Sequence, residues 1–139
     1  MKKCLPLLLA APLLIGAGGT SSLEITVTGI ANTRGALLAC IWTEKSGFPT
    51  CQKSKTAIRQ TVKISGSTMK VRFSNLAPGT YAASVHHDAD GDGKLKTNFI
   101  GMPKEGVGIS NNPGGMPGWS KSLVKVNGAG AISITMRYL

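Results

Sequence analysis

The sequence predicts an all-β domain, specifically a seven-stranded antiparallel β-sandwich. Seven short segments carry strand patterns, and turn residues separate them, with 18 glycines and 7 prolines in 139 residues. No long stretch shows helical periodicity. The length suits one domain.

The first half of the chain supplies four of these strands. Residues 23–29 alternate apolar and polar side chains, which is typical of a strand with one buried face. Residues 35–42 form a more continuously apolar strand. Residues 60–65 and 68–74 are predicted to pair as a hairpin around the Gly66-Ser67 turn.

The second half supplies three more strands, interrupted by one long loop. A Pro78-Gly79 turn leads into a strand at residues 81–87. About thirty residues rich in Gly, Pro and Asn follow, and loops of that length in a compact domain tend to be functional or held by a ligand. Residues 121–126 and 131–138 close the domain.

The N-terminus predicts export. Two lysines, a short apolar run and a small-residue segment match a secretory signal peptide, which we place at residues 1–20, with the domain at residues 21–139. The apolar run is too short for a confident membrane span. We therefore expect a periplasmic or secreted protein with no membrane span after cleavage.

Two cysteines remain in the domain, Cys40 and Cys51, and an oxidising compartment favours a disulfide between them. The bridge would hold the polar segment of residues 43–57, for which we expect one short helical turn. Neither thiol lies in a catalytic motif.

Without Lys2 and Lys3 the chain has 14 basic and 6 acidic residues, a net charge of +8. Such a charge favours an anionic envelope or extracellular partner, and otherwise it only aids solubility. Basic residues are not interleaved with aromatics, which argues against nucleic acid. Basic edge strands argue against pairing between copies, so we expect a monomer.

Half of the acidic residues lie between positions 88 and 92. The Asp-x-Asp-x-Asp-Gly pattern matches the start of an EF-hand calcium loop, although Phe99 replaces its final glutamate. Carboxylate oxygens favour Ca²⁺, the expected cofactor, and an acidic turn without an ion is the alternative. The candidate ligands are Asp88, Asp90, Asp92, the Lys94 backbone oxygen, Asn98 and Glu105.

Other candidate binding residues flank this loop. His86 and His87 are adjacent on a strand and should face opposite sides of the sheet, so one is expected to pack and the other to approach the carboxylates. Asn111, Asn112 and Trp119 lie in a Gly- and Pro-rich segment that is either a binding lip or, for the tryptophan, a plug at the end of the sandwich.

Three blocks of sequence resemble one bacterial family. They are residues 76–81 (LAPGTY), residues 87–95 with the acidic loop, and residues 101–112 with Gly-x-Pro-Lys-Glu and Ser-Asn-Asn. The chain resembles the secreted proteins grouped as domain of unknown function number 2141. The resemblance implies a small exported sandwich, similar in outline to transthyretin-like and carboxypeptidase-regulatory-like modules, and implies no established activity. For the fold itself we expect an immunoglobulin-like or transthyretin-like sandwich.

Together these patterns favour a non-enzymatic binding or structural module with a calcium-binding acidic loop. One alternative is a metal-assisted hydrolase that uses a histidine with Asp88 and Glu105. The other is a purely structural module without a bound ion. No nucleophile motif points to covalent catalysis.

Overall fold

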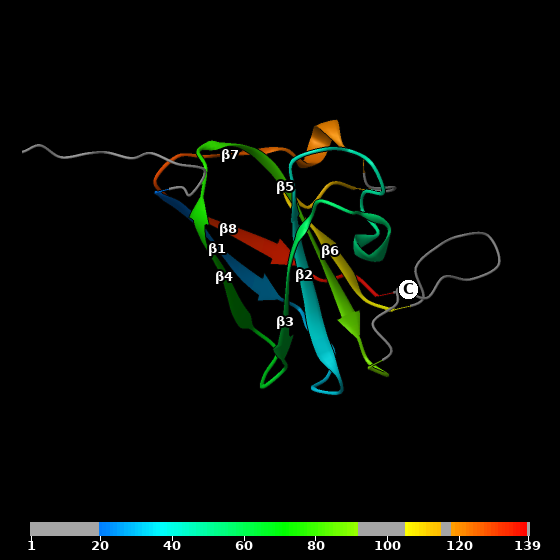
Figure 1. The fold of residues 1–139 in the computed structure, drawn as a ribbon. Coiled ribbons are helices and arrows are strands. Elements are labelled where there is room, and N and C mark those ends of the chain that lie inside the picture. Colours follow the sequence, from blue (N-terminus) through cyan, green and yellow to red (C-terminus); the bar gives the residue numbers. More distant parts are fainter. Residues whose placement is uncertain (1–19, 92–104, 115–117, 139) are drawn as a thin grey trace, which may run out of the picture.

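Two β-sheets pack face to face in the computed structural model, which describes residues 20–91, 105–114 and 118–138 (Figure 1). One sheet has three strands in the order β4-β1-β8, and the other has the order β3-β2-β5-β6, with β7 paired to β5. The fold is therefore an all-β sandwich, as the strand patterns predicted.

The three-stranded sheet is built around the first strand of the domain. β1 (Ser21–Thr28) pairs antiparallel with β4 (Met69–Leu76) and parallel with β8 (Ala129–Thr135). Burial alternates residue by residue along β1, because successive side chains point to opposite faces of a strand. The apolar face of this sheet turns toward the second sheet.

The second sheet is built around β5 (Gly79–Asp88), which is buried from Tyr81 onward. It lies between β2 (Ala36–Trp42) and β6 (Val107–Ile109) and pairs antiparallel with both. Its first three residues also pair antiparallel with β7 (Val124–Val126). β3 (Ile58–Lys63) extends the sheet beyond β2. Because β5 is covered on both faces, it is a rigid base for the residues at its end.

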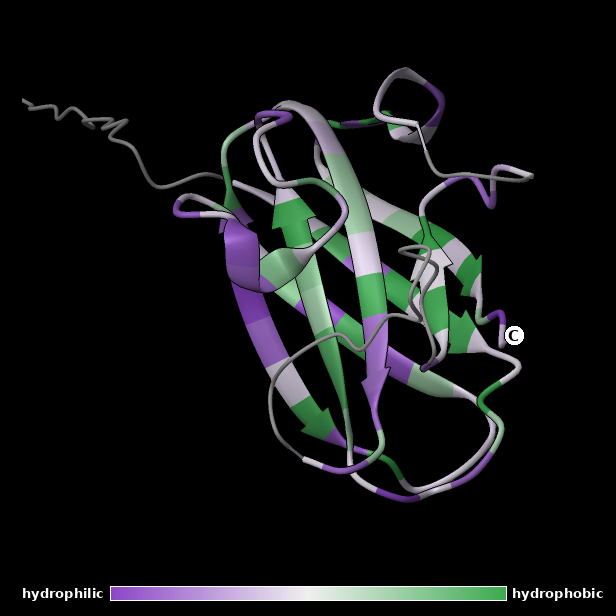
Figure 2. Cartoon of the chain, turned by 90° about the vertical axis from the view of Figure 1, so that its right-hand side faces the viewer, coloured by the Kyte–Doolittle hydropathy of each residue, from purple (hydrophilic) through white to green (hydrophobic). Residues whose placement is uncertain are grey.

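A single large hydrophobic core fills the space between the sheets. Apolar side chains alternate with polar ones along most strands, which gives the banded pattern of Figure 2. The largest fully buried members of this core are Phe73, Leu23, Ile25, Leu37, Ile41 and Ile134.

A smaller cluster of buried residues covers the outer side of the second sheet. Cys40 and Cys51 form the predicted disulfide, and Trp42 packs beside it. The Trp42 indole donates a hydrogen bond to Ser84 Oγ at 3.0 Å and meets the Phe48 ring edge to face at 5.2 Å between centroids. The loop between β2 and β3 is thereby fixed across the sheet. It contains the expected short helical turn, a 3₁₀ turn η1 (Cys51–Lys53), and a second one, η2 (Ser120–Ser122), precedes β7.

Three details of the prediction were wrong. The described residues form eight strands where seven were expected, because β6 lies inside the segment that was read as a long loop. The sandwich is not wholly antiparallel, since β1 and β8 run parallel. The expected hairpin at residues 60–74 does not pair, because β3 and β4 belong to different sheets and the chain crosses between them.

Within the described ranges, none of the helical segments is long and apolar enough to cross a bilayer. The predicted signal peptide at residues 1–20 lies outside these ranges apart from its last residue.

Candidate metal centre and adjoining pocket

Three carboxylates converge where β5 ends. Asp88 is the last residue of this strand, Asp90 follows two residues later, and Glu105 comes from the segment that leads into β6. One oxygen of each lies within 4.8 Å of the others, close enough to share one metal ion. Asp88 is buried, Glu105 is largely buried and Asp90 is exposed. The cluster is thus anchored inside the protein and open on one side.

The backbone around Gly35 positions the start of the acidic loop. Gly35 adopts a φ of +71°, and a Cβ atom there would lie 2.0 Å from the Asp88 carbonyl oxygen and 2.9 Å from Ala89 backbone atoms. Only glycine meets both demands, since it accepts the left-handed conformation and has no side chain. The loop before β2 therefore packs directly against the end of β5.

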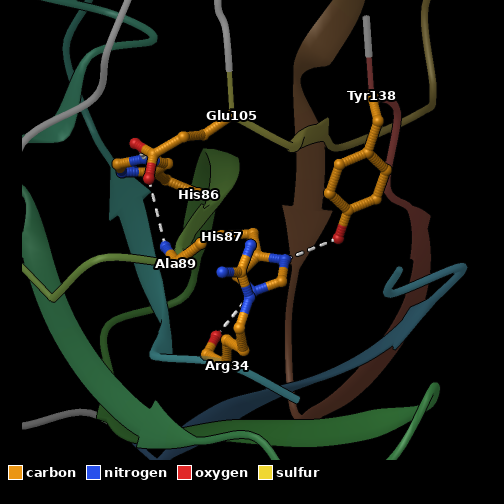
Figure 3. A network of polar contacts seen from close by, with 6 residues as sticks. All are labelled: Arg34, His86, His87, Ala89, Glu105 and Tyr138. Atoms are coloured by element: carbon orange, nitrogen blue, oxygen red, sulfur yellow. Dashed lines mark hydrogen bonds and ion pairs between the residues drawn. The ribbon is translucent and has the colours of Figure 1, made fainter. Parts of the chain in front are cut away.

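Both oxygens of Glu105 are oriented by hydrogen bonds. His86 Nε2 lies 2.8 Å from Oε1, and the Ala89 backbone N–H donates to Oε2 at 3.1 Å (Figure 3). The His86 and Glu105 side chains retain only 8% and 12% of their exposure, so water competes little for this contact. The carboxylate of Glu105 is consequently held over the end of β5. Among the described residues, no hydrogen-bond partner reaches His86 Nδ1.

His87 is part of a second hydrogen-bonded chain. Its Nδ1 lies 2.7 Å from the Tyr138 hydroxyl, and its Nε2 lies 2.8 Å from the Arg34 carbonyl oxygen. A carbonyl only accepts, so Nε2 carries a proton in this arrangement, and in the neutral imidazole the Tyr138 hydroxyl donates to Nδ1. The same hydroxyl accepts the Ala31 N–H at 3.0 Å. This chain ties the end of the polypeptide to β5.

A pocket of about 200 Å³ opens between these two networks. Its lining residues come from the loop before β2, the end of β5, the approach to β6 and the segment after β8: Asn32, Arg34, His87, Ala89, Glu105, Gly106 and Tyr138. Glu105 belongs to both the pocket and the carboxylate cluster.

The other residues singled out from the sequence fall into two groups. Asp92, Lys94 and Asn98 lie outside the described residues. The second group, Asn111, Asn112 and Trp119, lies after β6 and does not join the carboxylate cluster. Asn111 donates to the Lys121 and Leu123 carbonyl oxygens, Asn112 bonds the β8 backbone at Ser133 and Thr135, and Trp119 packs edge to face on Phe48. These three side chains therefore hold loops onto the sandwich.

Sequence reasoning missed Arg34, Asn32 and Tyr138. Asn32 and Arg34 lie more than 50 residues before the acidic loop, and Tyr138 lies well after it in the sequence. No local pattern links these residues to the loop. Gly35, which follows Arg34, was the available sequence signal that another backbone segment approaches the chain closely at this point.

The cluster offers hard oxygen ligands. Oxygen donors suit Ca²⁺ and Mg²⁺, whereas zinc sites usually include histidine nitrogen or cysteine sulfur. His86 and His87 do not belong to the three-residue group: His86 bonds Glu105 through Nε2, and both ring nitrogens of His87 bond protein groups.

These features define a class of protein: a small, disulfide-bonded β-sandwich with a carboxylate cluster at the end of a central strand. A family model described as "uncharacterized protein conserved in bacteria (DUF2141)" matches residues 25–134. The chain belongs to this family, which confirms the resemblance seen in its motifs. Searches of curated proteins and of solved structures found no match.

Proposed function

We propose that this protein is an exported, non-enzymatic binding module whose carboxylate cluster holds Ca²⁺. One observation carries the proposal: Asp88, Asp90 and Glu105 bring oxygens within 4.8 Å of one another in a chain that has only six acidic residues. Like charges at that separation repel, and a divalent cation between them converts the repulsion into attraction.

Burial strengthens this argument. Asp88 keeps 6% of its exposure, and the side chain of Glu105 keeps 12%. A buried charge is costly unless it is paired or coordinates a metal. Hydrogen bonds from His86 and Ala89 orient Glu105 in this buried position. A divalent ion bound by these carboxylates would offset part of the cost of their burial.

The loop chemistry favours calcium over magnesium. Calcium accepts six to eight oxygen ligands in flexible geometry, and loops supply them readily. Asp92, the Lys94 carbonyl oxygen and Asn98 would complete the shell around the three converging residues. For so small a set of charged ligands we expect a Kd of roughly 10⁻⁴ to 10⁻³ M, the range of extracellular calcium modules.

The proposals that the protein is exported and that it binds an anionic partner rest on other features. The N-terminal leader pattern and the Cys40–Cys51 disulfide support an oxidising, extracytoplasmic compartment. The charge of +8 left after removal of the leader supports an anionic envelope or extracellular partner. A non-enzymatic role is supported by His87, whose two ring nitrogens are both engaged in hydrogen bonds within the protein.

Isothermal titration with CaCl₂ tests the proposal. The wild-type protein should bind one Ca²⁺, and Asp90→Asn and Glu105→Gln should each weaken binding by about tenfold or more, because each removes a ligand charge. Glu44→Gln is the matched control, an exposed carboxylate in the loop after β2, and should bind as the wild type does. Absence of calcium heat in the wild type, or equal binding by Asp90→Asn, would refute the site.

A further inference from the structure

The side of the sandwich formed by β3 and β4 carries a concentration of positive charge. No acidic residue lies between Glu44 and Asp88 in the sequence, although lysines and arginines recur throughout this stretch. Five of these basic residues are exposed on β3, on β4 or in the loop that leads into β3, and we refer to them as the basic edge: Lys53, Lys55, Arg59, Lys70 and Arg72.

The two strands of this edge lie side by side, although they belong to different sheets. On β3, the Gln60 side chain donates a hydrogen bond to the Arg72 carbonyl oxygen on β4. Val71 and Phe73 are buried between the sheets, and successive side chains point to opposite faces of a strand. Lys70 and Arg72 therefore point away from the core, on the outer face of the three-stranded sheet.

The β3 part of the basic edge is tied to the disulfide loop. Arg59 lies opposite Cys40 on β2, and the disulfide joins Cys40 to Cys51 at the start of the turn η1. The Arg59 guanidinium donates a hydrogen bond to the Ser54 carbonyl oxygen at 2.6 Å. These two links keep the lysines on either side of Ser54 close to Arg59.

An exposed apolar side chain accompanies these charges. Ile58, the first residue of β3, is 46% exposed. It lies opposite the buried Ile41 and on the same face of β3 as Gln60, which contacts β4. Ile58 therefore points toward the open side between the two sheets, whereas Arg59 points to the outer face of its own sheet. Basic side chains from both sheets flank this isoleucine.

Nearby acidic residues offset only part of this charge. Glu24 lies opposite Arg72 on β1 and 3.9 Å from the Lys70 amine, so it offsets one of the five positive charges. Glu44 is followed directly by Lys45, and the loop after β2 therefore adds no net charge. The basic edge stays positive overall.

The carboxylate cluster lies toward the other end of the second sheet. Ile58 lies opposite Ile41, which lies opposite Ala83, five residues before Asp88. At the rise of an extended strand this separation is about 17 Å, twice the Debye length of about 8 Å at physiological salt. Lys63 is left out of the basic edge because it lies in the same row of the sheet as Asp88.

A bilayer surface fits this combination of groups. Attraction of basic side chains to anionic headgroups and burial of apolar surface are the two terms that hold proteins at a membrane surface. The basic edge has five cationic groups around one exposed isoleucine, and no aromatic ring is among these residues for a sugar to stack on. We propose that the basic edge docks on a bilayer that contains anionic phospholipids, with Ile58 entering the headgroup layer. This inference rests on the anionic-partner part of the function proposed above and does not require the calcium site.

Vesicle flotation tests the proposal. The protein is used in its exported form, without the predicted leader at residues 1–20, because an apolar leader would itself bind lipid, and the sandwich begins at Ser21. In EDTA, it should bind vesicles of phosphatidylglycerol and phosphatidylcholine in equal parts, and it should not bind phosphatidylcholine alone. Added NaCl should weaken binding, because salt screens exposed charges.

Variants locate the binding surface. Lys55→Gln should weaken vesicle binding by about fivefold, the effect of one charge near an anionic surface, and adding Lys53→Gln should weaken it further. Ile58→Ser should also weaken binding, because it removes the apolar group. Arg137→Gln is the matched control, since it removes one exposed charge beside β6, at the opposite edge of the sheet from β3, and should bind as the wild type does. Urea unfolding checks that each variant is folded.

Four results would overturn the docking proposal. Equal binding to phosphatidylcholine alone would show that anionic lipid is not recognised, and equal losses in Lys55→Gln and Arg137→Gln would show a response to net charge only. Unchanged binding by Ile58→Ser would contradict the apolar contact. Binding to alginate without binding to the anionic vesicles would assign the basic edge to a polysaccharide.

Asp90→Asn separates this proposal from the calcium site. The variant should bind the anionic vesicles as the wild type does, with or without EDTA, because Asp90 lies outside the basic edge. Vesicle binding that appears only when Ca²⁺ is added would refute docking through the basic edge. Vesicle binding in EDTA by a protein that binds no Ca²⁺ would leave the docking proposal standing while the calcium site fails.

Discussion

Tyr138→Phe removes one hydroxyl that links the C-terminal segment to two other parts of the sandwich. The change leaves the Ala31 N–H to solvent, because Ala31 is exposed and water replaces the lost acceptor. His87 is 1% exposed, so its Nδ1 loses its donor where water has little access. An unsatisfied buried polar group costs about 1–3 kcal/mol, and we expect the variant to lose that much stability.

Urea unfolding measures this loss. For a domain of this size, about 1–3 kcal/mol corresponds to a drop in the midpoint of roughly 1 M with an unchanged slope. Tyr81→Phe is the matched control: the Tyr81 hydroxyl makes one local bond, to the Ala77 carbonyl at 2.6 Å. Ala77 is exposed, so water can satisfy its carbonyl after the change. A loss in Tyr138→Phe no greater than in Tyr81→Phe would refute the reasoning.

A double-mutant cycle with His87→Leu isolates the pair. In that background Tyr138→Phe should cost clearly less, since no buried imidazole nitrogen is left without a donor. Additive losses would show that the two side chains do not act together.

Two further predictions concern the frame around the site. Replacing Cys40 and Cys51 together by serine should lower the free energy of unfolding by about 3 kcal/mol, because the disulfide closes a loop with a sequence separation of 11 and removes its entropy from the unfolded chain. In urea, the wild type with its disulfide reduced should unfold like this variant. Gly35→Ala should lower both stability and calcium affinity, because the new methyl group meets the backbone at Asp88. Gly128→Ala is the control: Gly128 has a φ of +82° and a Cβ there would have no atom within 4 Å, so this change should cost only backbone strain of about 1–2 kcal/mol. Equal losses of stability in both glycine variants, with calcium affinity unchanged, would contradict the close-approach argument.

The sequence predicted those parts of the fold that depend on local patterns. The alternation in residues 23–29 identified β1, and the two cysteines identified the disulfide, because each signal is complete within a short stretch of chain. Strand partners were harder to predict. A Gly-Ser turn between two alternating segments fits a hairpin, yet here the chain uses it to cross from β3 in one sheet to β4 in the other.

β6 was missed because three residues are too few to show a period. Val107–Ile109 forms a strand because it pairs with β5, which is a tertiary requirement. The candidate site likewise contains residues that local sequence predicts and residues that it does not. Asp88 and Asp90 stand out locally, whereas the Arg34 and Tyr138 walls of the pocket are brought together only by the completed sandwich.

The first strand also determines how the domain would be presented on a support. Ser21, at the start of β1, pairs with Leu76, which lies just before β5 begins. The carboxylate cluster lies at the other end of β5, ten residues away, or about 30 Å at the rise of an extended strand. A tether or affinity tag attached ahead of β1 would therefore leave the ion-binding end pointing outward, so immobilisation through the N-terminal side suits ligand screening on a surface.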